Sequence, residues 1–240
     1  MAKTEKKQAK GTAEPASKPA KFNEKLGFLI LKRRKSILVF AIIILVVKFG
    51  LGIYMVFENK AKNNAAEQLE KLEASYLAIE NNSELENKTM LASVIVEADK
   101  LIKAQKGRYP AIRAIVIKAE ALYALGDIEG SEKAFADLAE SYPRSHLAVV
   151  ALFNAAVAAE ERNELENALS YLLKAENKYF DSAAIDRIRL ATGRIYEKQK
   201  SYEKAMEVYL RLTATGTESD WTKIARDRII FIKTQGFLNK

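Results

Sequence analysis

The chain has 240 residues, 49% of them apolar, and it contains no cysteine. The lack of thiols excludes disulfide bonds and thiolate metal sites. The formal net charge of +8 is concentrated in residues 1–35, where nine Lys and two Arg stand against three Glu, while residues 36–240 hold 28 basic and 28 acidic side chains. Because the positive charge is confined to one end, we predict no nucleic-acid partner for the rest of the chain.

Residues 1–35 are predicted to be a disordered basic tail on the cytoplasmic side of a membrane. Residues 1–25 are rich in Lys, Ala, Thr, Pro and Glu and nearly free of bulky apolar side chains, so they cannot bury enough surface to offset chain entropy. The positive charge is interpreted as a topology signal with attraction to anionic lipid. Contact with a ribosome or another acidic cytoplasmic partner is the alternative.

Residues 36–57 are predicted to form one transmembrane helix. From Ile37 to Phe57 the sequence has 21 residues with a single charge, and a helix of this length spans roughly 31 Å, about the thickness of a bilayer's hydrocarbon core. The basic cluster Lys32–Lys35 precedes the span, and positive flanks stay cytoplasmic. We therefore expect a bacterial inner-membrane protein with residues 58–240 in the periplasm. A cleaved signal peptide fits less well, because the apolar region is too long and no small-x-small site follows it.

The charge within the span, Lys48, is a candidate contact with another membrane protein. A charge near the bilayer centre costs about 2.5–3.5 kcal/mol on insertion scales, and a carboxylate or carbonyl of a neighbouring protein would offset that cost. The alternative is that its ammonium group reaches the interface along its own aliphatic stem.

Residues 58–110 are predicted to be a helical stem and a degenerate first repeat. A helix over 61–80 has apolar residues three and four apart, which is the spacing of a packing seam. We expect this seam to pack on the next helix after a break at 81–83, and a homo-oligomer held by the seam is the alternative. The seam consists of Ala65, Leu69, Leu72, Tyr76 and Ile79, and the facing residues are Leu91, Ile95, Ala98, Leu101 and Ile102.

Residues 111–220 are predicted to contain three copies of one helix pair. A pattern repeats with a fixed offset of 37 residues, which indicates one supersecondary unit copied and stacked. The matching columns are Ser131, Ala168 and Ala205; Glu129, Glu166 and Glu203; Phe135, Leu172 and Tyr209; Ala119, Ala156 and Gly193; and Ile128, Leu165 and Tyr202.

Each copy is predicted to consist of a helix, a short turn and a second helix. The first helices are expected near 111–125, 146–162 and 183–199, and the second helices near 128–141, 165–178 and 202–214. The turns are Gly126–Asp127, Asn163–Glu164 and Lys200–Ser201, where Gly and Asn tolerate left-handed backbone and Asp127 and Ser201 can cap the next helix.

Two Tyr-Pro pairs and the C-terminal residues complete the predicted elements. Tyr109–Pro110 and Tyr142–Pro143 are each expected to end the helix before them, because proline cannot continue a helix. Residues 221–240 are predicted to be a C-terminal capping helix and tail.

The motif Gly126-Asp127-x-Glu129-x-Ser131, followed by Phe135 and Pro143, resembles the tetratricopeptide repeat (TPR). The resemblance covers 111–214 well and 61–110 loosely, and it implies an all-α, TPR-like α-solenoid of helix hairpins that binds other proteins. The small residue that the family has in its first helix matches Ala119, Ala156 and Gly193. The family's tyrosine matches Tyr196 in the third unit, whereas the first two units have Leu122 and Ala159 instead. The family's proline is replaced by Phe180 in the second unit and by Thr217 in the third.

The order of a basic tail, one span and a small repeat domain outside also resembles the YfgM-like ancillary subunits of the Sec translocon. Those are inner-membrane proteins associated with the Sec channel and with periplasmic chaperones. This resemblance rests on architecture, and it implies Sec channel subunits or periplasmic chaperones as partners.

The sequence contains no pattern that predicts catalysis or a cofactor. It has no glycine-rich phosphate loop, dinucleotide fingerprint or zinc spacing. Its one histidine, His146, is expected to be a surface residue, because a lone exposed histidine forms neither a metal site nor a triad. We therefore predict that the chain is not an enzyme and binds no cofactor or metal.

The first helices of stacked pairs line the concave side of such a solenoid, and there we predict a groove for an extended or helical peptide. Tyr123 and Phe153 are the expected anchors, and Arg187 and Arg194 are expected to meet acidic groups. A solvated groove, with partners binding elsewhere, is the alternative. The predicted groove residues are Arg113, Val116, Glu120 and Tyr123; Val150, Phe153, Val157 and Glu160; and Arg187, Leu190, Arg194 and Glu197.

Some TPR proteins that bind chaperones hold a C-terminal carboxylate with Lys and Asn on this face. Here Val116, Glu120, Phe153 and Val157 occupy the face, so we do not expect that clamp.

Taken together, these patterns predict a membrane-anchored interaction scaffold, as an accessory of Sec translocation or of periplasmic chaperones. Three alternatives stay open: a scaffold for envelope assembly or cell-wall synthesis, an enzyme subunit or lipid-binding protein whose partner supplies the chemistry, and a homo-oligomeric structural protein.

Overall fold

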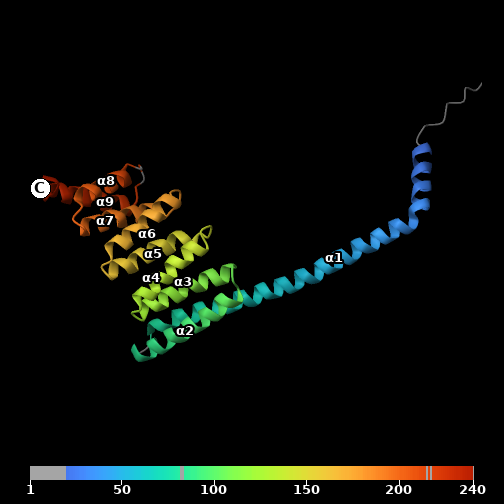
Figure 1. Ribbon diagram of the computed structural model, residues 1–240, viewed down its shortest axis with the longest axis horizontal. Coiled ribbons are helices and arrows are strands. Elements are labelled where there is room, and N and C mark those ends of the chain that lie inside the picture. The colour runs from blue at the N-terminus through green and yellow to red at the C-terminus, as the bar shows by residue number, and fades with distance from the viewer. Residues whose placement is uncertain (1–19, 82–83, 215, 217, 240) are drawn as a thin grey trace, which may run out of the picture. The chain divides into compact units, whose positions relative to one another are not determined.

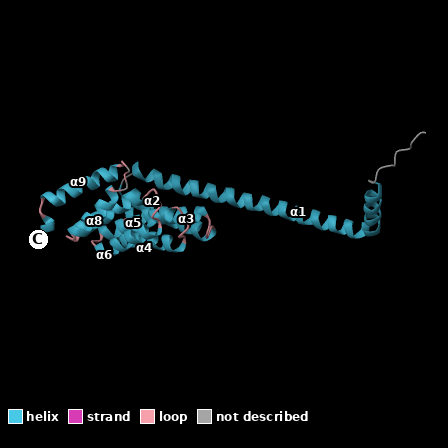
Figure 2. Cartoon of the chain, turned by 90° about the horizontal axis from the view of Figure 1, so that it is seen from above, coloured by secondary structure: helices cyan, strands magenta, loops and turns pink. Residues whose placement is uncertain are grey.

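The computed structural model describes residues 20–81, 84–214, 216 and 218–239. The chain divides into two compact units, residues 1–60 and residues 61–240. Within the described ranges the regular structure is entirely helical, and short loops connect the helices (Figure 2). The predicted all-α solenoid of helix hairpins is therefore confirmed.

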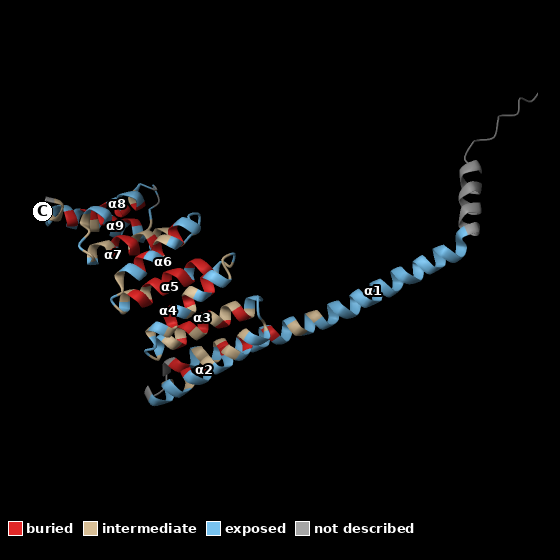
Figure 3. Ribbon diagram, in the orientation of Figure 1, coloured by how far each residue is buried: buried red, intermediate tan, exposed pale blue. Residues whose placement is uncertain are grey.

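The described part of the first unit is the N-terminal part of α1 (Ala20–Leu77), whose backbone leaves helical geometry at Arg33 with φ −107° and ψ 15°. From Arg33 onward α1 is long and apolar enough to span a membrane, and it is the one helix of the described residues with that property. Its large apolar side chains between Ile37 and Phe57 are 43% to 73% exposed. The described residues therefore leave these side chains uncovered, as the pale blue of this part of α1 shows (Figure 3).

The structure differs from the sequence analysis for the tail. Residues 20–35 belong to α1, whereas disorder was predicted for all of residues 1–35. This stretch has no proline and lies next to a strongly apolar helix, and extending an existing helix costs far less than nucleating one. The predicted disorder of residues 1–19 lies outside the described residues.

The second unit contains the C-terminal part of α1 and eight further α-helices among the described residues, and from α2 onward each contacts the next along the chain (Figure 1). A short 3₁₀ helix at Ala78–Asn81 follows α1, and another at Phe237–Asn239 follows α9. The helices are α2 (Glu84–Ala104), α3 (Tyr109–Ala124), α4 (Ile128–Ser141), α5 (Leu147–Glu161), α6 (Leu165–Lys178), α7 (Ile185–Lys198), α8 (Tyr202–Thr213) and α9 (Asp220–Thr234).

The turns within the three helix pairs form as the sequence predicts. Gly126, Asn163 and Lys200 have positive φ values of 87°, 60° and 60°, which end each first helix in the left-handed region. Asp127 caps α4 by accepting a hydrogen bond from the Gly130 amide at 2.9 Å. Ser201, the other predicted cap, makes no side-chain cap bond to α8.

Tyr109–Pro110 does not end a helix, which corrects the expectation from sequence. Helix α2 already ends at Ala104, and Gly107 turns the chain with a φ of +80°. Pro110 lies in the first turn of α3, where a missing amide hydrogen costs nothing. Tyr142–Pro143 follows α4, which ends at Ser141, as predicted.

The predicted seam of α1 packs inside the chain. Leu69, Leu72 and Ile79 are buried in one cluster with side chains of α2 and α3. A homo-oligomer held by this seam would require the same side chains to leave that core, so the structure argues against this alternative. The seam's partners in the cluster are Leu91, Val94, Ala98, Leu101, Ala114, Ile117 and Ala121.

The third helix pair is adjusted around a large side chain. Tyr209 of α8 is fully buried, and a Cβ added to Gly193 of α7 would lie 2.2 Å from its Cε1 atom. The equivalent positions hold Ala156 with Leu172 in the second pair. Glycine in the third pair therefore provides the space that the larger ring needs.

Candidate functional site

The predicted groove residues lie on α3, α5 and α7, the first helices of the three pairs, and the side of the repeats that they were predicted to line is here called the first-helix face. Val116 and Phe153 are buried in the core, so they contribute little free surface. Tyr123 is 38% and Val150 is 40% exposed, which leaves apolar surface available there. Arg187 and Arg194 are exposed, and Arg113, Glu120, Val157, Glu160, Leu190 and Glu197 are half-buried.

Charged residues on the α5, α7 and α9 part of this face bind one another. Glu160 of α5 accepts hydrogen bonds from Arg194 and Lys198 of α7, each over 2.6 Å. Glu197 of α7 accepts from both Nε and Nη2 of Arg228 of α9, with 2.9 Å between Nε and Oε1. Helix α5 is thus joined to α7, and α7 to α9, by an acid and the cations that bind it.

The pKa values of these two acids follow from the same contacts. Burial alone would raise the pKa of the Glu160 carboxyl, but the hydrogen bonds from Lys198 and Arg194 outweigh burial and hold the pKa below its usual range. For Glu197, burial is likewise outweighed by hydrogen bonds from Arg228 and Tyr209, so its pKa is also lowered. Both acids are therefore ionised and neutralised within the chain at neutral pH.

The arginine predicted to meet ligand acids, Arg187, lies against aromatic rings. Its guanidinium is 4.0 Å from the ring centroid of Phe153 and 6.0 Å from that of Trp221. Such geometry is a cation–π contact, and it covers the predicted anchor Phe153. Sequence reasoning missed these pairings because the paired residues are 31 or more positions apart in the chain. Whether they meet depends on how neighbouring helices are rotated against each other.

The α1, α3 and α5 part of the face is different, because it holds a cavity of about 260 Å³. Glu120 lines this cavity and makes no hydrogen bond or ion pair with any side chain in the described part of the chain. Burial raises the pKa of the Glu120 carboxyl, and the positive charge of Arg113 offsets this only in part. Arg113 itself donates to Glu73 over 2.8 Å. The remaining lining residues are Tyr76, Tyr123, Ala124, Phe135, Asn154 and Val157.

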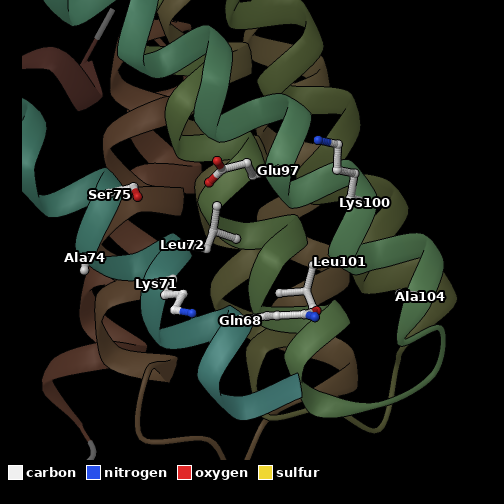
Figure 4. A pocket seen from close by; sticks show the side chains of 9 residues that line it. All are labelled: Gln68, Lys71, Leu72, Ala74, Ser75, Glu97, Lys100, Leu101 and Ala104. Carbon is white, nitrogen blue, oxygen red and sulfur yellow. The ribbon is translucent and has the colours of Figure 1, made fainter. Parts of the chain in front are cut away.

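A second hollow lies between α1 and α2 (Figure 4). It has a volume of about 770 Å³ and is widely open to solvent. Leu72 and Leu101 form its apolar part, while Gln68, Lys71 and Glu97 are polar. Lys71 is held by Glu67 over 2.7 Å. This hollow contains no buried charge that calls for a ligand.

A cluster outside the first-helix face was also missed by sequence reasoning. Arg162, in the turn before α6, binds Glu132 over 2.8 Å and Glu164 over 2.7 Å. The Tyr171 hydroxyl donates to Glu132 over 3.0 Å, and burial followed by this hydrogen bond raises the pKa of Tyr171 to about 12. These contacts join α4 to α6 and satisfy one another, so their role is structural.

The remaining sequence candidates lie apart from this face. His146 is exposed just before α5 and stacks on Tyr109, with 6.1 Å between ring centroids. No group of acids and histidine in the described ranges has the arrangement of a metal site. Lys48 is on α1, beside Phe49, Gly52 and Ile53.

The chain matches a family model described as a tetratricopeptide repeat-like domain over residues 32–233. No curated protein matches it in sequence. Among solved structures it is similar to the nearly identical TPR-like repeats of a Podosopora anserina protein provisionally described as a kinesin light chain, with 9% identity, a TM-score of 0.53, and 72% of this chain and 87% of that chain covered. It is also similar to BtubC (BKLC) from P. vanneervenii, with 10% identity, a TM-score of 0.52, and 75% and 85% covered. These likenesses concern the fold.

Proposed function

Because the chain belongs to the tetratricopeptide repeat-like domain family, we propose that it is a membrane-anchored protein-interaction scaffold on the periplasmic face of a bacterial inner membrane. Repeats of this fold are typically non-enzymatic interaction scaffolds, and no catalytic family is indicated. The observation that supports the anchor is the uncovered apolar surface of α1, together with a family match that begins at residue 32 and so includes the predicted span, 36–57.

The proposed orientation rests on charge. Arg33, Arg34 and Lys35 directly precede the span, whereas Glu58, Lys60 and Lys62 follow it with no comparable excess. Positive residues near a span stay on the cytoplasmic side, so the repeats are on the other side. A C-terminal alkaline phosphatase fusion should be active and a C-terminal green fluorescent protein fusion dark. The reverse result would put the repeats in the cytosol and reject the proposed compartment.

We propose the first-helix face as the binding surface, with the exposed Tyr123 and Val150 and the half-buried Val157 as the main contact. Exposed aromatic and aliphatic side chains beside a cavity are the usual anchors of protein interfaces. The proposed partners are Sec channel subunits or periplasmic chaperones. Lys48 is proposed to contact a partner's carboxylate or carbonyl within the membrane, since its charge is costly there.

Site-specific photo-crosslinking in intact membranes tests the surface and the partner together. A photoreactive residue at Val150 or Tyr123 should capture a Sec channel subunit or a periplasmic chaperone, identified by mass spectrometry. Leu210 of α8, which is 47% exposed and outside this face, is the matched control position and should capture neither. Capture of cell-wall enzymes alone would favour the envelope-assembly alternative. Equal capture from Leu210 would reject the first-helix face.

A further inference from the structure

The position of the acid changes between the helix pairs. The offset of 37 residues aligns Tyr123 with Glu160 and Glu197, and it aligns Glu120 with Val157 and Arg194. The acid of α5 lies where α7 supplies a cation, and the acid of α7 lies where α9 supplies one. In α3 the acid is Glu120, one turn earlier, and α5 presents Val157 to the same cavity. Among the described residues, no cation forms a hydrogen bond or an ion pair with this carboxylate, and Arg113 acts on it only through its charge at a longer range.

The surroundings of Glu120 suit a cation from outside. The cavity of about 260 Å³ beside it is lined by three aromatic residues, Tyr76, Tyr123 and Phe135, and by Asn154. Aromatic faces attract ammonium and guanidinium groups, and a carboxylate in a partly dehydrated site binds them by charge-assisted hydrogen bonds. The partly exposed ring of Tyr123 leaves the entrance open to a side chain.

Burial explains why this position favours a cation over other ligands. Dehydration of the Glu120 carboxylate is unfavourable, and Arg113, the neighbouring cation, is already engaged by Glu73. An incoming cation would offset that cost, whereas an acidic group would add repulsion and a neutral group would leave the charge without a partner.

We propose that this cavity is a specificity pocket that receives a lysine or arginine side chain from the protein segment bound on the first-helix face. This inference rests on the proposed function, because it names the chemistry of the segment that the scaffold binds. The α1, α3 and α5 part of the first-helix face would thus require a basic residue in the segment that it binds.

Peptide selection by the full-length chain tests the pocket. The chain in detergent micelles, immobilised through its N-terminus, is used to select from a random peptide display library. Peptides enriched by the wild type should share a Lys or Arg at one position. Replacing that residue by norleucine in a selected peptide should weaken binding about tenfold or more, the loss expected for a hydrogen bond to a charged group. In Glu120→Gln the same replacement should make little difference.

Glu140→Gln is the matched control, because Glu140 is an exposed glutamate of α4. It should preserve the tenfold dependence on the basic residue. Thermal unfolding followed by circular dichroism verifies that both variants remain folded. As a second variant, Glu120→Lys should reverse the preference, so that Asp or Glu is enriched at the same position.

The outcomes separate the two proposals. The pocket inference is wrong, while the scaffold function stands, if peptides are enriched but share no basic position. The same holds if the norleucine replacement weakens peptide binding as much in Glu120→Gln as in the wild type. If the wild type enriches no peptide above a scrambled library, the peptide-binding face fails and the pocket inference fails with it.

Discussion

The two parts of the first-helix face differ in how the chain uses its own charges. From α5 to α9, Glu160 and Glu197 receive cations from the following helix, and Arg187 covers Phe153. From α1 to α5, Glu120 faces a cavity and receives none from the described residues. The same repeated unit thus builds a closed surface at one end and an open one at the other. Cations of the following helices stabilise the closed part, and the lack of such a cation at Glu120 among the described residues leaves its cavity available to a partner.

The largest expected effect tests how tightly the closed part is packed. Gly193→Ala should destabilise the fold by about 3 kcal/mol, the upper end of overpacking costs, because the added methyl group would lie 2.2 Å from the buried Tyr209 ring. The measurement is chemical unfolding of the full-length chain followed by circular dichroism.

An internal control for this change comes from the second helix pair, which holds Ala156 and Leu172 at the equivalent positions. Adding Tyr209→Leu to Gly193→Ala should recover part of the lost stability, since the smaller side chain leaves room for the methyl group. Tyr209→Leu alone gives the reference loss in the free energy of unfolding. If adding it to Gly193→Ala lowers the stability by that same amount, the two positions do not interact and the packing argument is wrong.

The fold could be predicted from sequence to a considerable extent, for physical reasons. The columns at a fixed offset set the helix pairs, and turn chemistry at Gly126 and Asn163 set their ends. Both signals are local, because helix ends depend on nearby residues. The error at Pro110 has the same origin. A proline is compatible with the first turn of a helix as well as with the end of one, and the pattern does not distinguish these cases.

The candidate site was less predictable than the fold. The register placed the groove residues on the right helices, but it does not say which side chains meet across neighbouring helices. Arg194 meets Glu160 and Arg187 meets Phe153 because of how α5 and α7 are rotated against each other. The cavity beside Glu120 has a contribution from Tyr76 of α1, a residue that the sequence analysis assigned only to a seam. Such sites depend on distances between elements, which a one-dimensional pattern does not contain.

A smaller effect, dependent on pH, is expected in the open part. Because burial raises the folded-state pKa of Glu120 above its ordinary value of 4.5, the ionised carboxylate is disfavoured in the folded chain. Stability should therefore fall as pH rises from the ordinary value through the raised pKa. Glu120→Gln removes this penalty and should be more stable than the wild type at neutral pH by about 1 kcal/mol, the low end of the cost of an unpartnered buried polar group.

Unfolding of the wild type and of Glu120→Gln over an acidic to neutral pH series provides the measurement. The difference in the free energy of unfolding between the two proteins should reach its full size above the raised pKa of Glu120. It should vanish in acid, where the carboxyl is protonated in both the folded and the unfolded chain. The exposed Glu140→Gln serves as the control and should show no such trend. A difference that stays constant across the series would mean that Glu120 is not dehydrated in the folded chain.

The smallest effect is expected for Arg194→Ala in the closed part. The Arg194 side chain is 55% exposed, and exposed ion pairs contribute about 0.2–1 kcal/mol. Glu160 would keep its 2.6 Å contact with Lys198, so its charge stays neutralised and the loss should be at the low end of that range. Arg194→Ala combined with Lys198→Ala leaves Glu160 without a cation and should cost more than the sum of the two single changes. Additive losses in unfolding experiments would show that the two cations act independently and that Glu160 does not need a cation to remain in the folded chain.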